Sequence, residues 1–409
     1  MTFLSFVPSF SIMHFLSRKS RFFPSTSMSS SQNSCVLPQD MLMEILCRLS
    51  VKDLLRLKRV SKGWNHLISD STFVKLHLQR SSKNTHILLT FHDYFYTKRR
   101  NFAIVCPVQD LLDNPNSTLE TLSHKYRPFD RNYSILGVCN GLVCLGDYNC
   151  EFKEYWVRFG NPATRIMSKN SPHVRLNPDH YNYPYMFMIG FGYDDWSDTY
   201  QVVFLDNNRK NSQKLDVRVY CSGDKCWRKT FTCDAVPTLT GLGTCVSGTL
   251  NWLVFPKSCS DGKQLGSVKM SELEIFSYHL KKETCSYFSV PDGTSEVLPF
   301  LPALVTLKGC LGLSHINGHY LVVWLKREFS DEKSWSKLLN LYNPICDDLE
   351  ILYMCENDNV VVLANTNKGE FILYNIREKR IDGRQKYNKF KMNLFSYDYV
   401  QSLVLPYRN

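Results

Sequence analysis

The first strongly patterned stretch of the chain is residues 37–68, where apolar residues recur at helical spacing. One stripe holds Leu42, Ile45, Leu46 and Leu49, a second holds Trp64, Leu67 and Ile68, and Leu54, Leu55, Leu57 and Val60 lie between them. Helices this short bury little of their own surface. The pattern therefore predicts that part of this apolar face is covered by another protein.

Polar residues between these stripes predict where the helices begin. Ser50 followed by Asp53 resembles a capping box for a second helix, and Ser61 is the expected cap of a third. The Ser71-Thr72 pair is expected to start a short fourth turn. We therefore predict a compact helical module over residues 37–81.

From about residue 84 the pattern changes to short apolar runs separated by turn residues, which is typical of β-strands. A loose repeat, in which glycine opens a strand after a tight turn, recurs at Gly141, Gly248, Gly309 and Gly369. The last three lie 61 and 60 residues apart, and the interval of 107 residues between Gly141 and Gly248 has room for a weaker copy of the repeat. This spacing predicts inner strands of a propeller-like array with six or seven blades. A two-sheet β-sandwich, or two stacked β domains, is the competing interpretation.

A closed array has to bring its two ends together, because an open edge strand invites aggregation. We expect residues 85–91 and residues 401–406 to contribute to the same blade. The fold class that follows is α+β in separate domains, with a small three-helix module before a large all-β domain. The expected boundaries are 1–36 for a disordered leader, 37–81 for the module and 84–409 for the β domain.

Charge is distributed unevenly along the chain. The net charge is +11, yet residues 37–81 alone carry eight Lys and Arg against four Asp and Glu, a net +4. Residues 1–36 add three basic residues and no acidic one. This excess favours an acidic partner near the amino end. A nucleic-acid-binding protein would instead show a basic, aromatic-rich stripe on its large domain, and the sequence has none.

The sequence contains no strong signature of catalysis, cofactor binding or a metal site. Gly190-x-Gly192 and Gly241-x-Gly243 lack the third glycine of a dinucleotide loop. Asp194, Asp195 and Asp198 surround Trp196, and a solvated turn between strands is favoured over a Ca²⁺ loop. The 15 cysteines are an odd, scattered set that we interpret as reduced thiols.

The amino-terminal residues do not have the order of a secretory signal, because their basic residues follow the apolar stretch instead of preceding it. The run from Phe3 to Leu16 is too short to span a bilayer. We expect a disordered leader, with Met1 and Met28 both open as the start of translation, and no membrane partner.

The helical stretch resembles the F-box. The resemblance is carried by Leu37-Pro38, Glu44-Ile45-Leu46, Arg48-Leu49, Asp53-Leu54, and Val60, Lys62, Trp64 and Ile68. The chain departs from many members at Ser50, where they have proline. The resemblance implies docking onto the Skp-type adaptor of a cullin–RING ubiquitin ligase. The residues expected to bind the adaptor are Leu37, Pro38, Ile45, Leu46, Leu49, Leu54, Leu57, Val60 and Trp64.

The remainder resembles the F-box-associated domain of plant F-box proteins, often described as F-box/kelch-repeat-like. The motifs that carry this resemblance include Val138-Cys139-Asn140-Gly141-Leu142, Asn161-Pro162-Ala163-Thr164-Arg165, Val246-Ser247-Gly248-Thr249-Leu250 and Gln401-Ser402-Leu403-Val404. The paired glycines of true kelch repeats are missing. By this resemblance the β domain captures a target protein for ubiquitination.

The two resemblances together predict a non-catalytic substrate receptor of the cytoplasm, the nucleus or both, with adaptor, cullin and RING partners and no cofactor or metal. Two alternatives stay open. In one, the chain docks on the adaptor as a decoy or assembly factor without delivering a target. In the other, the β domain is a hydrolase or sugar oxidase, which would require a pocket carboxylate or metal cluster.

Overall fold

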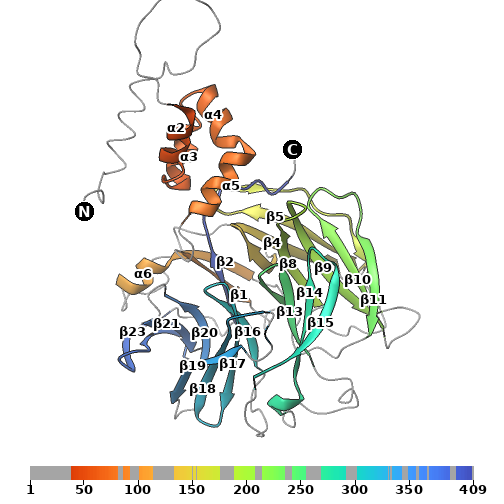
Figure 1. Cartoon of the computed structure of the whole chain (residues 1–409), viewed down its shortest axis with the longest axis vertical. Helices are drawn as coiled ribbons and strands as arrows, with labels where there is room; N and C mark the ends of the chain where they lie inside the picture. The colour runs from red at the N-terminus through yellow and green to blue at the C-terminus, as the bar shows by residue number, and fades with distance from the viewer. Residues whose placement is uncertain are drawn as a thin grey trace, which may run out of the picture.

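The protein has a small helical module above a large β domain (Figure 1). The computed structural model describes residues 38–81, 86–92, 101–113, 133–149, 151–152, 154–175, 188–207, 214–234, 242–254, 269–291, 302–329, 331, 334–342, 349–355, 359–365, 368–386 and 393–407. The expected leader and Leu37 lie outside these residues.

The module contains helices α2 (Gln39–Leu46), α3 (Val51–Leu57), α4 (Lys62–Ser69) and α5 (Ser71–Arg80). The expected caps of α3 and α4 are confirmed, since Ser50 Oγ accepts a hydrogen bond from the Asp53 amide and Ser61 Oγ accepts one from the Trp64 amide, each at 3.2 Å. The expected fourth turn is a full helix of 10 residues. Its cap is Asp70 rather than Ser71, because the Asp70 carboxylate accepts from the Thr72 and Phe73 amides.

The strands of the β domain form six groups within the described residues, which we call blades 1 to 6. Blade 1 contains β1 (His86–His92), β2 (Asn101–Pro107) and β24 (Asn393–Tyr399), and α6 (Val108–Asp113) follows β2. Blade 2 contains β3 (Ser134–Cys139), β4 (Leu142–Asn149), β5 (Glu154–Asn161), β6 (Ile166–Met167) and β7 (Val174–Arg175). Blade 3 contains β8 (Met188–Asp194), β9 (Thr199–Asn207), β10 (Lys214–Cys221) and β11 (Arg228–Asp234).

Blade 4 contains β12 (Leu242–Val246), β13 (Thr249–Val254), β14 (Glu274–His279) and β15 (Thr284–Ser289), with the short helix η4 (Met270–Glu272) before β14. Blade 5 contains β16 (Ala303–Leu307), β17 (Cys310–Asn317), β18 (Tyr320–Lys326) and β19 (Trp335–Tyr342). Blade 6 contains β20 (Leu349–Met354), β21 (Val360–Asn365), β22 (Glu370–Asn375) and β23 (Arg380–Lys386).

The innermost strands of the blades close a ring. Strands pair antiparallel within each blade, and one parallel pairing of β8 with β12 joins blades 3 and 4 into an eight-stranded sheet. The strands β24, β3, β8, β12, β16 and β20 each lie beside the next, and β20 lies beside β24. The propeller-like architecture is therefore confirmed, and the sandwich interpretation is wrong because the sheets are arranged as blades around a closed ring and not as one stacked pair.

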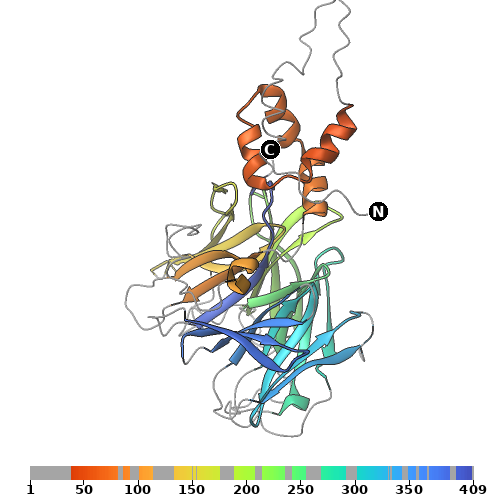
Figure 2. The ribbon, with the colours of Figure 1, turned by 90° about the vertical axis from the view of Figure 1, so that its left-hand side faces the viewer.

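One apolar cluster fills each gap between neighbouring blades. Between blades 1 and 2, for example, Leu88, Val105 and Tyr399 pack with Val143 and Leu145. Each blade therefore buries both of its faces against neighbours, which explains why its strands read as nearly continuous apolar runs. The core of the domain is therefore distributed around the ring. Figure 2 shows the helical module and the β domain from a second side.

The ends of the domain meet in blade 1, as expected, but through a different segment. Strand β24 is the innermost strand there, and it pairs with β1 from His86 opposite Tyr399 to His92 opposite Asn393. The expectation that residues 401–406 supply the strand is wrong. They continue past β24 in extended but unpaired form and lie beneath the helical module.

The repeated glycines occupy turns, although their strands are not the innermost ones. Gly141, Gly248 and Gly309 have φ of +80°, +73° and +72°, and each lies between the first and second strands of a blade. Gly369 lies between the second and third strands of blade 6. The repeat therefore marks hairpin turns that need positive φ. The 107-residue interval does contain an extra blade, blade 3.

Candidate functional site

The helical module has its own apolar core. Leu46, Leu54, Leu57 and Trp64 are at most 3% exposed, and they pack with Phe73 of α5. The four come from three helices whose apolar stripes face one another, which is why the helical period predicted them as a group. They lie inside the module. Their side chains therefore fix the packing of the helices but are not part of the module's surface.

The surface of the module retains apolar side chains that the chain itself does not cover. Pro38 is exposed, and Met41 and Val60 are 55% and 41% exposed. Ile45 and Leu49 are half-buried. Pro38, Met41 and Ile45 follow one another at spacings of three and four residues, so they share one face of the start of the module and of α2. Met41 was absent from the residues expected to bind the adaptor, although the same spacing includes it.

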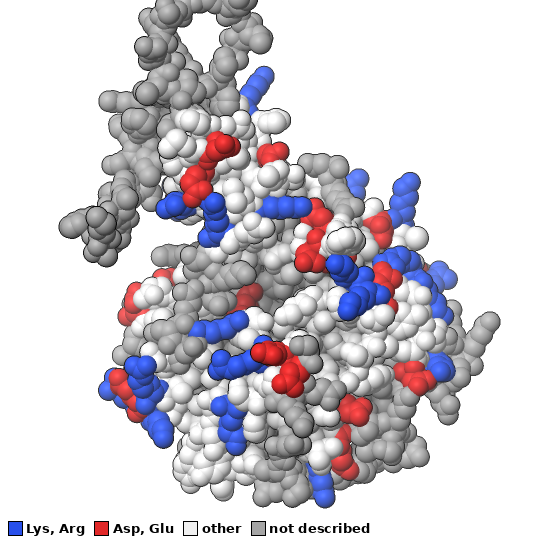
Figure 3. All heavy atoms as spheres, viewed as in Figure 1, with Lys and Arg blue, Asp and Glu red and all other residues white. Residues whose placement is uncertain are grey.

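Charged side chains link the first and last helices. The Glu44 carboxylate accepts hydrogen bonds from Arg80 of α5 and from Arg48, the latter at 3.1 Å. These two guanidinium groups lower the pKa of Glu44 below its usual value. Basic side chains, including those of Arg48 and Arg56, remain largely exposed. Figure 3 shows Lys and Arg side chains at several points on the module.

His77 connects α5 to the segment between α2 and α3. Its Nε2 lies 3.0 Å from the carbonyl oxygen of Leu49, and because a carbonyl only accepts, Nε2 carries the proton. The ring is 3% exposed, and this burial lowers the pKa of His77. The periodicity did not identify this residue, because a buried polar ring on a helix end has no distinctive spacing.

The carboxyl-terminal segment forms the floor of the module. Leu403 is 2% exposed and belongs to the module's apolar cluster, and Ala163 of the turn after β5 packs against the same cluster. The Asn161 side-chain amide donates to the carbonyls of Ser402 at 3.0 Å and Val404 at 2.9 Å. These residues belong to motifs that carried the family resemblance, and the structure brings them to one place.

Two further contacts hold this joint. A Cβ on Gly141 would lie 2.3 Å from Ser402 Oγ, so only glycine allows the turn to approach the segment so closely. Asp198, in the turn between β8 and β9, forms an ion pair with Lys75 of α5 at 2.7 Å. The turn around Trp196 was expected to be solvated. Trp196 is indeed 77% exposed, but the turn also contacts the module.

The structure offers no candidate metal centre within the residues it describes. Asp194 is 5% exposed, and its carboxylate accepts hydrogen bonds from Trp196 and Ser197 amides, which uses its oxygens in the turn itself. No group of three or more His, Cys, Asp or Glu is arranged to hold an ion in the described ranges. None of the described helices has the length and apolar character to cross a bilayer.

Comparisons with known proteins match both parts of the chain. The family described as "F-box domain" matches residues 35–76, and the family described as "F-box associated beta propeller domain" matches residues 86–389. An F-box/kelch-repeat protein of Arabidopsis thaliana is 29% identical over 353 residues, covering 84% of this chain and 89% of the relative. The F-box protein CPR1 of the same plant is 23% identical, covering 84% and 83%.

Proposed function

The chain belongs to the F-box proteins with an F-box-associated β-propeller domain, and from this premise we propose that it is the substrate-recognition subunit of an SCF-type cullin–RING ubiquitin ligase. The F-box, residues 37–81, docks on a Skp-type adaptor and through it joins the cullin and RING subunits. The propeller binds a target protein. The chain itself is not a catalyst. It raises the effective concentration of the target near the charged ubiquitin carrier. It acts in the cytoplasm, the nucleus or both.

The observation that supports adaptor docking most directly is the uncovered apolar face of the F-box. Met41 and Val60 are 55% and 41% exposed, whereas the propeller contacts the core of the module through Leu403 and Ala163. Pro38, Met41 and Ile45 share one face at the start of the module, and apolar side chains left exposed together are typical of protein interfaces. The exposed basic residues beside them favour an acidic partner, and adaptors of the Skp type are acidic.

The residues expected to bind the adaptor divide into two groups by burial. Pro38, Ile45, Leu49 and Val60 are exposed or half-buried, and we propose that they contact the adaptor directly, together with Met41. Leu46, Leu54, Leu57 and Trp64 are buried, and they support docking by fixing the shape of the module. Leu37 keeps the anchoring role that the family resemblance implies.

Surface substitutions test this proposal. We expect Met41→Lys and Ile45→Lys each to lower adaptor binding at least tenfold, because each places a charge in an apolar contact, while the propeller stays folded. Adaptor co-purification measures the first effect and circular dichroism the second. Gln79→Lys, on the exposed part of α5, adds the same charge elsewhere on the module and serves as the control. Undiminished adaptor capture by both variants would reject the docking assignment.

A second measurement separates a receptor from a decoy. With the proteasome inhibited, a receptor makes at least one bound protein accumulate in ubiquitinated form, and Met41→Lys abolishes this accumulation. A chain that binds the adaptor but changes no protein's abundance would be a decoy or assembly factor. Point variants are preferable to deletion of residues 37–81, because deletion would expose Leu403 and leave an apolar surface on the propeller.

A further inference from the structure

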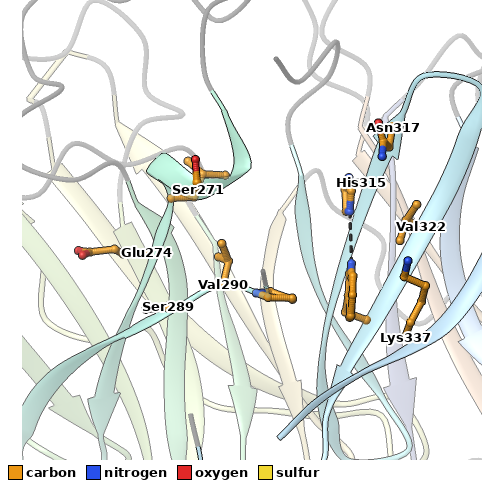
Figure 4. Close-up of a pocket in the computed structure, with 11 residues that line it drawn as sticks. Ser271, Glu274, Ser289, Val290, His315, Asn317, Val322 and Lys337 are labelled. Atoms are coloured by element: carbon orange, nitrogen blue, oxygen red, sulfur yellow. Dashed lines mark hydrogen bonds between the residues drawn. The ribbon is translucent and has the colours of Figure 1, made fainter. Parts of the chain in front are cut away.

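A cavity of about 530 Å³ lies between blades 4 and 5 (Figure 4). One wall is formed by η4, the start of β14 and the end of β15, and the other by β17, β18 and β19. The volume falls within the range of sites that hold small ligands or peptide side chains. The lining is mixed, with apolar Leu273, Val290 and Val322 beside polar and charged groups.

Three functional side chains lie on neighbouring strands of the blade 5 wall. In the strand register, Trp324 of β18 lies opposite Lys337 of β19, and Val322, two residues before Trp324, lies opposite His315 of β17. The indole Nε1 of Trp324 donates to His315 Nε2 at 3.4 Å. The Lys337 ammonium lies 4.8 Å from the centre of the Trp324 ring, a cation–π contact.

The His315 ring supports Trp324 on this wall. Because indole nitrogen only donates, His315 Nε2 must accept, and the proton of the neutral ring is then on Nδ1. His315 is 3% exposed and its Nδ1 is buried, so a ligand in the cavity does not reach that atom. Burial lowers the pKa of His315 to about 4, and the nearby charge of Lys337 contributes to that shift. His315 is therefore neutral near pH 7, and the positive charge on this wall comes from Lys337.

The acidic residue of the lining does not neutralise this wall. Glu274 is the carboxylate among the lining residues, and it comes from β14 on the opposite wall. Figure 4 shows the Glu274 side chain pointing away from His315 and Lys337. Among the described residues, no carboxylate forms an ion pair with Lys337. The charge on the blade 5 wall of the cavity is therefore positive and suits an anionic group.

Two exposed tyrosines lie on β18 and β19, the same two strands that contribute Val322, Trp324 and Lys337 to the cavity. Tyr320 lies on the same face of β18 as Val322 and Trp324, because alternate residues of a strand share a face. It is paired with Tyr342 of β19, the ring centres are 5.3 Å apart, and the two side chains are 42% and 58% exposed. A ligand that used both regions would be extended along β18.

The cavity lies on the side of the propeller away from the F-box. The turn between the first and second strands of a blade, such as the turn that contains Asp198, faces the module. The turn between the second and third strands is therefore at the opposite end of the blade. The turn after Asn317 of β17 is of this second kind, and blade 5 lies low in Figure 1 while the helices lie at the top. A protein bound there would not compete with the adaptor for space.

We propose that this cavity binds an extended segment of the target protein that carries an acidic side chain beside an aromatic or apolar one. The carboxylate pairs with the Lys337 ammonium, the neighbouring apolar side chain packs on Trp324 and Val322, and the segment continues over Tyr320 and Tyr342. This inference rests on the proposed function, because it assigns the target-binding step to a named site.

A displayed library of random ten-residue peptides, selected on the full chain in complex with its adaptor, tests the site. We expect enrichment of peptides with Asp or Glu next to an apolar residue. For an enriched peptide, Lys337→Glu and Lys337→Met each raise the dissociation constant about tenfold or more, the loss expected for one charge-assisted hydrogen bond. Tyr342→Ala weakens binding of the full peptide but leaves a three-residue version of it unchanged.

Lys281→Glu is the matched control, because Lys281 also makes a cation–π contact, at 4.1 Å over Trp196, but in the turn between β14 and β15. It should leave peptide affinity unchanged. Three outcomes would each overturn the proposal. The enriched peptides lack acidic residues, their binding is unchanged by both Lys337 variants, or a free dicarboxylic acid binds as tightly as the peptide. Adaptor co-purification is measured on the same samples, so failure of the peptide site is distinguishable from failure of F-box docking.

Discussion

At the scale of single residues, burial decides whether an apolar residue of a helical pattern belongs to the core or to the surface. Trp64 and Met41 both lie on the F-box helices, yet Trp64 is 3% exposed and Met41 is 55% exposed. A Trp64 substitution therefore tests the fold of the module, whereas a Met41 substitution tests its surface. Experiments that aim at the adaptor contact should use the second kind.

His77 makes the stability of the F-box depend on pH. Its folded pKa is lowered by burial, so as pH falls the unfolded chain takes up the proton first, near the ordinary value of 6.5. The neutral, buried ring of His77 therefore contributes to the free energy of unfolding above that pH, and this contribution is lost as the pH falls below it. We expect the unfolding temperature of the module to fall between pH 7 and pH 5, as measured by circular dichroism at helical wavelengths.

His77→Gln provides the matched comparison, since an amide can still donate to the Leu49 carbonyl but does not titrate in this range. The variant should flatten the pH dependence between pH 5 and pH 7. An identical decline in both proteins would show that another group is responsible.

At the scale of elements, the segment after β24 joins the two domains. Leu403 completes the apolar cluster of the F-box, and Asn161 holds the segment through two backbone carbonyls. The module is thus positioned by contacts with the propeller as well as by its covalent connection. In the function that we propose, such a joint would hold the bound target at a fixed distance from the ligase.

Leu403→Ala tests the joint. Removing a buried leucine side chain costs about 2–5 kcal/mol, and here the loss falls on the contact between module and propeller. We expect faster hydrogen exchange in α2 to α5 with little change in blades 3 to 5. Tyr407→Ala, at a 43% exposed position of the same segment, is the control. Uniform protection in the Leu403 variant would show that the module does not depend on this contact.

At the scale of the whole molecule, the ring is closed by a strand from the far end of the chain. Strand β24 lies innermost in blade 1, between β3 and β20, and it pairs with β1 along seven residues. Contacts between distant parts of the chain form late and at an entropic cost. The propeller is therefore complete only when the carboxyl-terminal strand is in place.

Deletion of residues 393–409 removes that strand and leaves β1 and the clusters beside it uncovered. We expect loss of soluble protein and of near-ultraviolet circular dichroism, because two inter-blade surfaces become exposed. Removing only 408–409 should have no effect. A soluble, cooperatively folding protein without residues 393–409 would contradict the role of this strand.

Local patterns in the sequence were sufficient for helices α2 to α4 and for the β character of the large domain. The helical period placed α2 to α4, Ser50 and Ser61 marked two helix starts, and the glycine spacing indicated repeated hairpins. These features depend on neighbours within a few residues, so they can be read without coordinates. The nine residues expected to bind the adaptor came from the same local pattern and from the family resemblance.

Sequence by itself determined the domain order, the type of secondary structure in each domain and the family, because periodicity and turn chemistry are short-range. Only the tertiary structure decided that β24 and not residues 401–406 closes the ring, that Leu403 lies beneath the F-box, and that His315 and Lys337 share a cavity. Each of these results brings together strands or segments that are distant along the chain or carried on separate strands. Their positions follow from how the blades pack, and no local pattern encodes that.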